Sequence, residues 1–211
     1  MQSDRLLYVM DPMCSWCWGF APVVRALAQQ AAAEGVPLQL RLGGLRRERM
    51  PLDPQTRGRI LAHWQAVQAS TGQSFDFAAA LPQGFIYDTE PACRALVIAQ
   101  SLDQTRVWPL LELIQQAFYA DGCDVTRAAL LVELAGQAGF ARGEFAAAFD
   151  GAEAIAATAA DFTWVEHLGI AGFPTLLAER GGRLALLTNG YQPLEALAPL
   201  LGRWLEQRAH A

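Results

Sequence analysis

Two cysteines that stand three residues apart are the side chains of this chain best suited to chemistry. Cys14 and Cys17 enclose Ser15 and Trp16. On the first turn of a helix such a pair lies on one face, close enough for a disulfide. The unpaired N–H groups and the positive end of the helix also favour a thiolate. The pattern predicts thiol–disulfide chemistry, with Cys14 attacking a disulfide and Cys17 resolving the intermediate.

The segments around this pair predict a β-α-β unit. A short apolar run at Arg5–Met10 is typical of a buried strand, and a helical pattern extends from about Trp18 to Ala33. An alternating pattern at Leu38–Leu42 predicts a second strand. Two strands joined by one helix should be parallel, with a right-handed crossover. In a cytosolic protein, Cys-x-x-Cys beside such a unit is typical of a thioredoxin-like redox motif.

The rest of the chain predicts a helical insertion followed by a β-β-α unit. Helical periodicity dominates residues 51–168, where Thr126 is expected to cap one helix and Ile155 to face inward on another. Strand patterns return beyond that stretch, and a last helix closes the chain. We therefore expect an α/β fold in which residues 1–50 and 169–211 form a thioredoxin-like domain and residues 51–168 form an all-α insertion domain.

Composition narrows the classes of function. Hydrophobic residues make up 53 % of the chain and charged residues 18 %, which is typical of a compact globular protein. The net charge of −5 argues against a general nucleic-acid binder. No apolar run approaches the ~20 residues that span a bilayer, and the first residues lack the basic start of a signal peptide. We expect a cytoplasmic protein without nucleic-acid or membrane partners.

Three further features leave alternatives open. Cys93 and Cys123 are expected to be free, buried thiols, since structural disulfides are rare in a reducing cytosol. A single Cys-x-x-Cys supplies too few ligands for zinc, so no metal is expected. His63 is either an ordinary helix residue or a proton donor near Cys14. The basic loop at 45–51 is either a solvated connection or a positive rim of the active site.

The longer motifs of the chain resemble one known family. The Cys-Ser-Trp-Cys segment at 11–19 and Ala-Gly-Phe-Pro-Thr at 171–175 are specific matches, and weaker ones occur at 63–64, 71–75 and 87–94. Together with the long helical insertion, they resemble the DsbA-like branch of the thioredoxin superfamily, and within it the cytosolic FrnE-like oxidoreductases. The resemblance covers essentially the whole chain.

This resemblance implies how the site is built. The strand at Pro174 should run antiparallel beside Arg5–Met10, with a cis proline whose loop faces the cysteine pair. The backbone of Phe173 would then pair with an extended substrate segment, and Trp16 would offer it an apolar contact. Pro12, Ser15 and His63 are expected to support the site.

The implied partners are disulfide-containing proteins or small molecules and an unidentified redox partner. No cofactor is expected beyond the redox-active disulfide, with glutathione as a candidate reductant. The chain departs from thioredoxins at Tyr8, where they carry a buried acid, so Asp11 or a water molecule are candidates for that role.

Two other functions stay open. Kappa-class glutathione transferases and hydroxychromene carboxylate isomerases share this architecture and use bound glutathione, but typically carry serine in place of the first cysteine. Cys14 and Cys17 together argue against that class. In a third reading, the cysteine pair is the switch of a redox-sensing module that binds client proteins.

Overall fold

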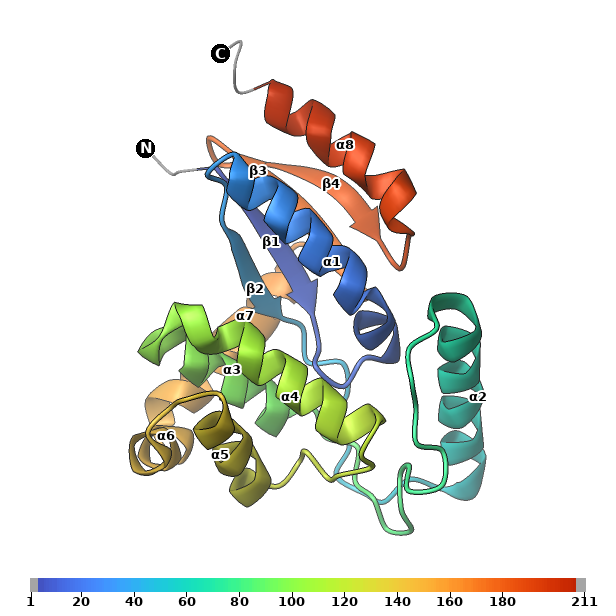
Figure 1. Ribbon diagram of the computed structural model, residues 1–211. Coiled ribbons are helices and arrows are strands. Elements are labelled where there is room, and N and C mark those ends of the chain that lie inside the picture. Colours follow the sequence, from blue (N-terminus) through green and yellow to red (C-terminus); the bar gives the residue numbers. More distant parts are fainter. Residues whose placement is uncertain (1–3, 208–211) are drawn as a thin grey trace.

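Four strands form one mixed sheet in the order β2-β1-β3-β4 (Figure 1). The computed structural model describes residues 4–207. β1 (Arg5–Met10) pairs in parallel with β2 (Leu38–Leu42) and antiparallel with β3 (Thr175–Arg180). β4 (Arg183–Asn189) completes an antiparallel hairpin with β3. The predicted β-α-β unit, the antiparallel neighbour of Arg5–Met10 and the closing hairpin are confirmed.

β1 is the centre of the fold because helices cover both of its faces. Its even-numbered residues join the main core beneath α1 (Ser15–Ala33) and α8 (Leu194–Glu206). Leu7 and Val9 point the other way and pack against Val165 of α7 (Ala152–His167). Figure 1 shows α1 and α8 on one side of the sheet and α7 beside β2 on the other. A strand buried on both faces explains the continuous apolar run in the sequence.

Every regular element between β2 and β3 is a helix, as predicted. The helices are α2 (Pro54–Thr71), α3 (Glu90–Leu102), a 3₁₀ turn (Gln104–Arg106), α4 (Val107–Tyr119), α5 (Ala128–Gln137), α6 (Arg142–Phe149) and α7. One cluster of buried side chains continues from the sheet into this block. The division into two domains stays a prediction, and its outer ends lie beyond residues 4–207. Within that range, no helix is long and apolar enough to cross a membrane.

Three local predictions were wrong. α1 begins at Ser15 instead of Trp18, because its first two residues are only partly buried and add little to the apolar periodicity. Thr126 does not cap α5: its hydroxyl donates to Asp124 (2.6 Å), one turn before the helix. Ile155 is 48 % exposed, since α7 is rich in alanine and its apolar face is poorly marked in the sequence.

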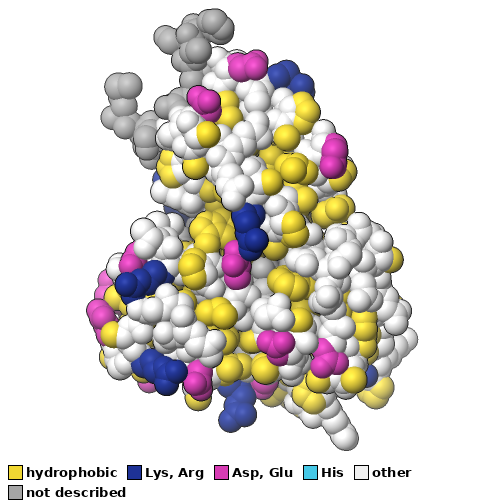
Figure 2. Space-filling view, viewed as in Figure 1, with side chains coloured by type: hydrophobic (Ala, Val, Ile, Leu, Met, Phe, Trp, Pro, Cys, Tyr) yellow, Lys and Arg dark blue, Asp and Glu magenta, His cyan; other side chains and the backbone are white. Residues whose placement is uncertain are grey.

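The surface carries charges of both signs. Figure 2 shows acidic, basic and apolar side chains interspersed on one face of the molecule. No single-sign field extends across that face, which agrees with the modest net charge of −5.

A proline interrupts the hydrogen-bond ladder of α1 just after the cysteine pair. Pro22 has no N–H, so the carbonyl of Trp18 lacks its helical partner. The side chain of Gln73, in the loop after α2, supplies the missing donor: its Nε2 lies 2.9 Å from the Trp18 oxygen. Trp18 in turn donates its indole N–H to the carbonyl of Ser74 (3.1 Å). This pair of hydrogen bonds fastens the loop after α2 to the active-site helix.

Replacing Gln73 with leucine should therefore destabilise the fold. The Trp18 carbonyl would lose its donor, which costs about 1–3 kcal/mol when a buried acceptor stays unpaired. Denaturant unfolding measures the change, and Gln137→Leu, at an exposed glutamine on α5, is the matched control. Equal losses in the two variants would contradict the assigned role of Gln73.

Candidate active site

Cys14 and Cys17 occupy the start of α1, with one facing a groove and the other facing the core. Cys14 is the N-cap residue, and its carbonyl accepts the backbone N–H groups of Cys17 (2.9 Å) and Trp18 (3.1 Å). The two thiols are not bonded to each other. Cys14 is 5 % exposed and lines the groove, whereas Cys17 is fully buried near Tyr8. Of the two thiols, Cys14 is the one that lines the groove.

The cis-proline loop forms the wall opposite Cys14. The Phe173–Pro174 peptide bond is cis, and the Cys14 thiol lies 3.6 Å from the Phe173 carbonyl oxygen. The carbonyl of Pro174 is occupied, because it accepts the N–H of Gly190 (2.7 Å). A side chain at Gly43 would place its Cβ 1.9 Å from the Phe173 ring, so glycine is needed there for the ring to take this position. The arrangement leaves the Phe173 backbone beside the thiol.

A groove of about 640 Å³ extends from Cys14 along α2. It brings together predicted site residues, part of the basic loop at 45–51 that was left open as a rim of the site, and residues that the sequence did not reveal. The predicted members are Cys14, Ser15, Trp16, His63 and Phe173. The others are Met13, Leu45, Arg46, Glu48, Thr56, Arg59, Ile60, Trp64 and Tyr87. Two arginines and one histidine face a single acid, so the groove favours anionic groups.

The structure shows where His63 and the basic loop at 45–51 lie relative to Cys14. His63 is exposed on α2 and lines the groove, so it stands in the same cavity as Cys14. In the basic loop only some arginines contribute: Arg46 lines the groove and lies 5.2 Å above the Tyr87 ring. Arg47 turns away and pairs with Glu166 of α7 (3.0 Å). Arg46 is also paired, with Glu48 of the same loop (3.5 Å), so each of these two arginines has an acidic partner.

The two tryptophans have different surroundings. Trp16 is partly exposed on the groove wall, with its ring 5.8 Å from that of Tyr191. Trp18 is buried and stacks on Tyr119 at 6.0 Å. Trp16 thus forms part of the groove surface, whereas Trp18 packs beneath the helix.

Asp11 is the buried hub that holds the cysteine loop in place. Its Oδ1 accepts the N–H of Met13 (2.8 Å), two residues along the same loop. Its Oδ2 accepts the N–H of Leu45 (2.7 Å) and the hydroxyl of Thr89 (2.6 Å), and it lies 3.5 Å from the Cys93 thiol. One carboxylate thus joins the active-site turn to the loop after β2 and to the start of α3. The sequence offered no signal for these partners.

The turn before Cys14 and the two other cysteines have well-defined surroundings. Pro12 is buried between Asp11 and Met13, in the turn that leads to Cys14. The hydroxyl of Tyr87 donates to the Met13 carbonyl (2.6 Å) and fixes the end of that turn. Cys93 is free and buried as expected, but Cys123, in the middle of the α4–α5 connection, is partly exposed.

Burial sets the protonation of the inner groups. Desolvation, followed by the hydrogen bond and charge of Cys14, raises the pKa of the Cys17 thiol well above its ordinary value. Burial also raises the pKa of Asp11, although hydrogen bonds from Thr89, Leu45 and Met13 oppose the shift. The Cys17 thiol is therefore protonated at neutral pH.

Comparison with known proteins agrees with this geometry. The chain resembles a candidate protein disulfide isomerase from Nitrosomonas europaea with 44 % identity and a TM-score of 0.91, over 98 % of this chain and 99 % of that one. It resembles the cytosolic disulfide reductase DsbM from Pseudomonas aeruginosa with 31 % identity and a TM-score of 0.76, over 95 % and 98 % of the two chains. A structure of DsbM with GSH matches at 27 % identity and a TM-score of 0.74, over 98 % and 100 %.

A 2-hydroxychromene-2-carboxylate isomerase matches with 14 % identity and a TM-score of 0.66, over 98 % of each chain, which shows a shared fold alone. No curated protein matches the chain. The model of the DSBA-like thioredoxin domain matches residues 5–202, nearly the whole chain. The protein therefore belongs to the DSBA-like thioredoxin domain family, the DsbA-type thiol–disulfide oxidoreductases.

Proposed function

We propose that Cys14 attacks disulfides of proteins or small molecules and that Cys17 resolves the resulting mixed disulfide. The observation that carries this assignment is the position of Cys14. Its thiol opens onto the groove at a helix start, 3.6 Å from the Phe173 carbonyl, while Cys17 lies one turn deeper. An extended substrate that pairs with the Phe173 backbone would present its sulfur to Cys14.

We further propose that the protein works in the cytoplasm and in the direction of reduction. The similarity to DsbM, which is described as a cytosolic disulfide reductase, supports this choice. In a compartment with a redox potential of about −250 mV, a cysteine pair with a potential of ~−120 mV would favour the dithiol over the disulfide by a factor of roughly 10⁴. Reduction or isomerisation of disulfides then needs no dedicated oxidase.

Glutathione is the reductant that the groove favours. It is a tripeptide with two carboxylates, and Arg46, Arg59 and His63 provide positive or hydrogen-bonding groups near Cys14. Glu48, which pairs with Arg46 (3.5 Å), is the acid of the groove that would face its ammonium group. The DsbM structure with GSH supports the assignment of this ligand class. Glutathione would reduce the Cys14–Cys17 disulfide through a mixed disulfide with Cys14.

Arg59→Gln should weaken the use of glutathione. Loss of one charge contact at an exposed site is expected to raise the KM for glutathione about three- to tenfold, with kcat little changed. The assay follows glutathione consumption with hydroxyethyl disulfide as substrate. Arg49→Gln is the matched control, because Arg49 belongs to the exposed basic loop but does not line the groove. An unchanged KM in Arg59→Gln would place the glutathione site elsewhere.

Two measurements test the proposed function: the rate of disulfide reduction and the redox potential of the cysteine pair. Wild-type protein should accelerate the reduction of insulin or hydroxyethyl disulfide by glutathione, and a glutathione titration read by tryptophan fluorescence should give a reducing potential. A potential near −120 mV, together with fast oxidation of reduced proteins, would reverse the assigned direction.

A further inference from the structure

A small inner cavity lies behind the cysteine pair, on the side away from the substrate groove. Its lining includes Tyr8 of β1, Cys17 of α1 and Gln115 of α4. The volume is about 10 Å³, close to the least that holds one water molecule. A water in such a cavity also needs two to four polar partners.

The cavity offers such partners beside the Cys17 thiol, with which the Tyr8 hydroxyl interacts. Among residues 4–207, the buried side-chain atoms without a regular hydrogen-bond partner include the Tyr8 hydroxyl and Gln115 Nε2. Tyr8 is 1 % exposed and Gln115 is 1 % exposed. Buried polar groups are nearly always hydrogen-bonded, to protein or to ordered water, so two such groups that line one cavity with a thiol indicate a shared partner.

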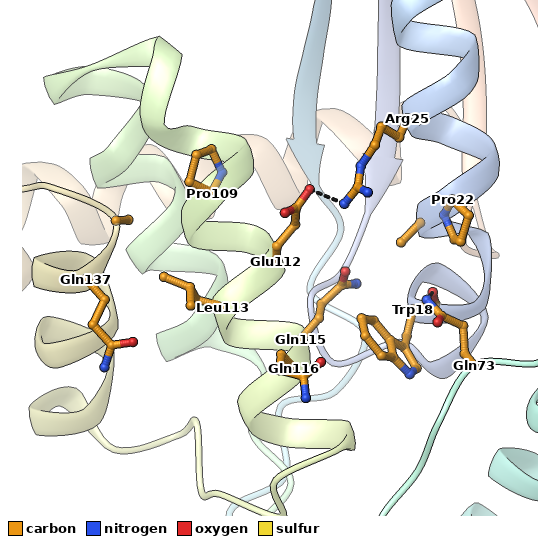
Figure 3. Close-up of a pocket in the computed structure, with 12 residues that line it drawn as sticks. Trp18, Pro22, Arg25, Gln73, Pro109, Glu112, Leu113, Gln115, Gln116 and Gln137 are labelled. Atoms are coloured by element: carbon orange, nitrogen blue, oxygen red, sulfur yellow. Dashed lines mark hydrogen bonds and ion pairs between the residues drawn. The ribbon is translucent and has the colours of Figure 1, made fainter.

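The inner cavity leads outward to a second groove. Arg25, Glu112 and Gln115 line both the inner cavity and a groove of about 620 Å³ between α1, α4 and α5. Figure 3 shows Gln115 on α4 between Trp18 and the ion pair that Arg25 makes with Glu112. We call this the rear groove and the groove that Cys14 lines the front groove. The two share no lining residue, although α1 contributes to both.

We propose that one water molecule, held by Tyr8 and Gln115 against Cys17, takes up the Cys17 proton during resolution and passes a proton to the rear groove. This inference rests on the proposed thiol–disulfide function. The substrate would occupy the front groove at that moment, so the buried thiol needs another way to reach solvent. The neutral Tyr8 hydroxyl would also donate a hydrogen bond to the thiolate as it forms.

Resolution of the mixed disulfide breaks one S–H bond and one S–S bond and forms one of each. The Cys17 S–H bond breaks, and the water accepts that proton while it releases one toward the rear groove. The Cys17 sulfur forms a bond with the Cys14 sulfur, and the bond between Cys14 and the substrate sulfur breaks. The substrate sulfur leaves with the electron pair and takes a proton from solvent in the front groove. The two cysteines are oxidised and the substrate disulfide is reduced.

Charged and titratable groups face Cys17 from each neighbouring element. Cys14 and Asp11 act on it from the active-site turn. Arg25 of α1 and Glu112 of α4 stand at the outer end of the cavity. Tyr119 of α4, whose own pKa is raised by burial and by the charges of nearby groups including Cys17, lies outside the cavity lining.

The test separates attack from resolution. Reduced protein is mixed with increasing hydroxyethyl disulfide, and tryptophan fluorescence is followed by stopped flow. The second-order phase reports attack by Cys14, and the plateau rate at high disulfide reports resolution by Cys17. Tyr8→Phe should lower the plateau rate about tenfold at neutral pH and move its pH midpoint upward by about one unit, as expected for loss of a hydrogen bond to a charged sulfur. The second-order rate should not change.

Gln115→Leu should lower the plateau rate in the same way. It provides an independent test if Tyr8→Phe perturbs folding. Tyr119→Phe is the matched control, since it also removes a buried hydroxyl without a regular partner. A crystal structure should show one ordered water within hydrogen-bond distance of the Tyr8 hydroxyl and Gln115 Nε2.

Wild-type plateau rates and midpoints in both test variants would overturn the proposal, as would an equal effect in Tyr119→Phe. A wild-type protein that does not react with the disulfide at all would instead reject the proposed function, and this inference with it.

Discussion

Replacement of Cys14 with serine is expected to abolish disulfide reduction, with a fall in kcat/KM of at least about 10³. A serine hydroxyl is not ionised at neutral pH, and no other thiol lines the front groove. The assay follows the reduction of hydroxyethyl disulfide by glutathione, with insulin reduction as the protein substrate. The loss should appear in the chemical step, so raising the substrate concentration should not restore activity.

Two companion variants sharpen this result. Cys17→Ser should still attack and then accumulate a mixed disulfide between Cys14 and the substrate, which mass spectrometry detects as an added thiol. Cys123→Ser is the matched control, because Cys123 lies on the α4–α5 connection away from the groove. Glutathione-dependent activity that survives in Cys14→Ser would point to the transferase and isomerase class. Client binding that survives loss of both cysteines would favour a redox-sensing module.

Asp11→Asn is expected to lower the free energy of unfolding by about 2–4 kcal/mol and to slow catalysis. The carboxylate accepts from Met13, Leu45 and Thr89, whereas an asparagine has a single acceptor oxygen. Its amide would face at least one backbone N–H, which leaves a buried donor unpaired at about 1–3 kcal/mol for each such group. The turn that carries Cys14 would then be held less firmly. Denaturant unfolding and the assay above measure both effects.

The pH dependence of stability distinguishes this carboxyl from an ordinary surface acid. Burial raises the pKa of folded Asp11, so between its unfolded value near ~3.9 and its higher folded value only the folded state keeps the proton. The contribution of Asp11 to stability is complete below the unfolded pKa and is lost as pH rises through the folded pKa. Asp11→Asn should lack this component, and Asp150→Asn, an exposed control, should retain it. Identical pH profiles for wild type and Asp11→Asn would contradict the assignment.

The sequence by itself determined the elements that depend on near neighbours. The apolar run of β1 and the alternation of β2 marked two strands, and the two glycines between β3 and β4 marked the hairpin, where both have positive φ. The spacing of Cys14 and Cys17 placed both thiols at one helix start. These features were readable because periodicity and turn preference act over a few residues. Where the periodicity was weak, as at Ile155, the prediction failed.

Only the tertiary structure decided what surrounds the thiols. Asp11 meets Leu45, 34 residues away, and Thr89, 78 residues away, while Cys14 meets the Phe173 carbonyl 159 residues away. Arg59 and His63 reach the groove because α2 packs beside the start of α1 (Figure 1). Such contacts follow from how whole elements pack, and residue spacing along the chain carries no record of them. Thus local sequence placed the two sulfurs at a helix start, whereas packing buried Cys17, which raises its pKa, and left Cys14 at the groove.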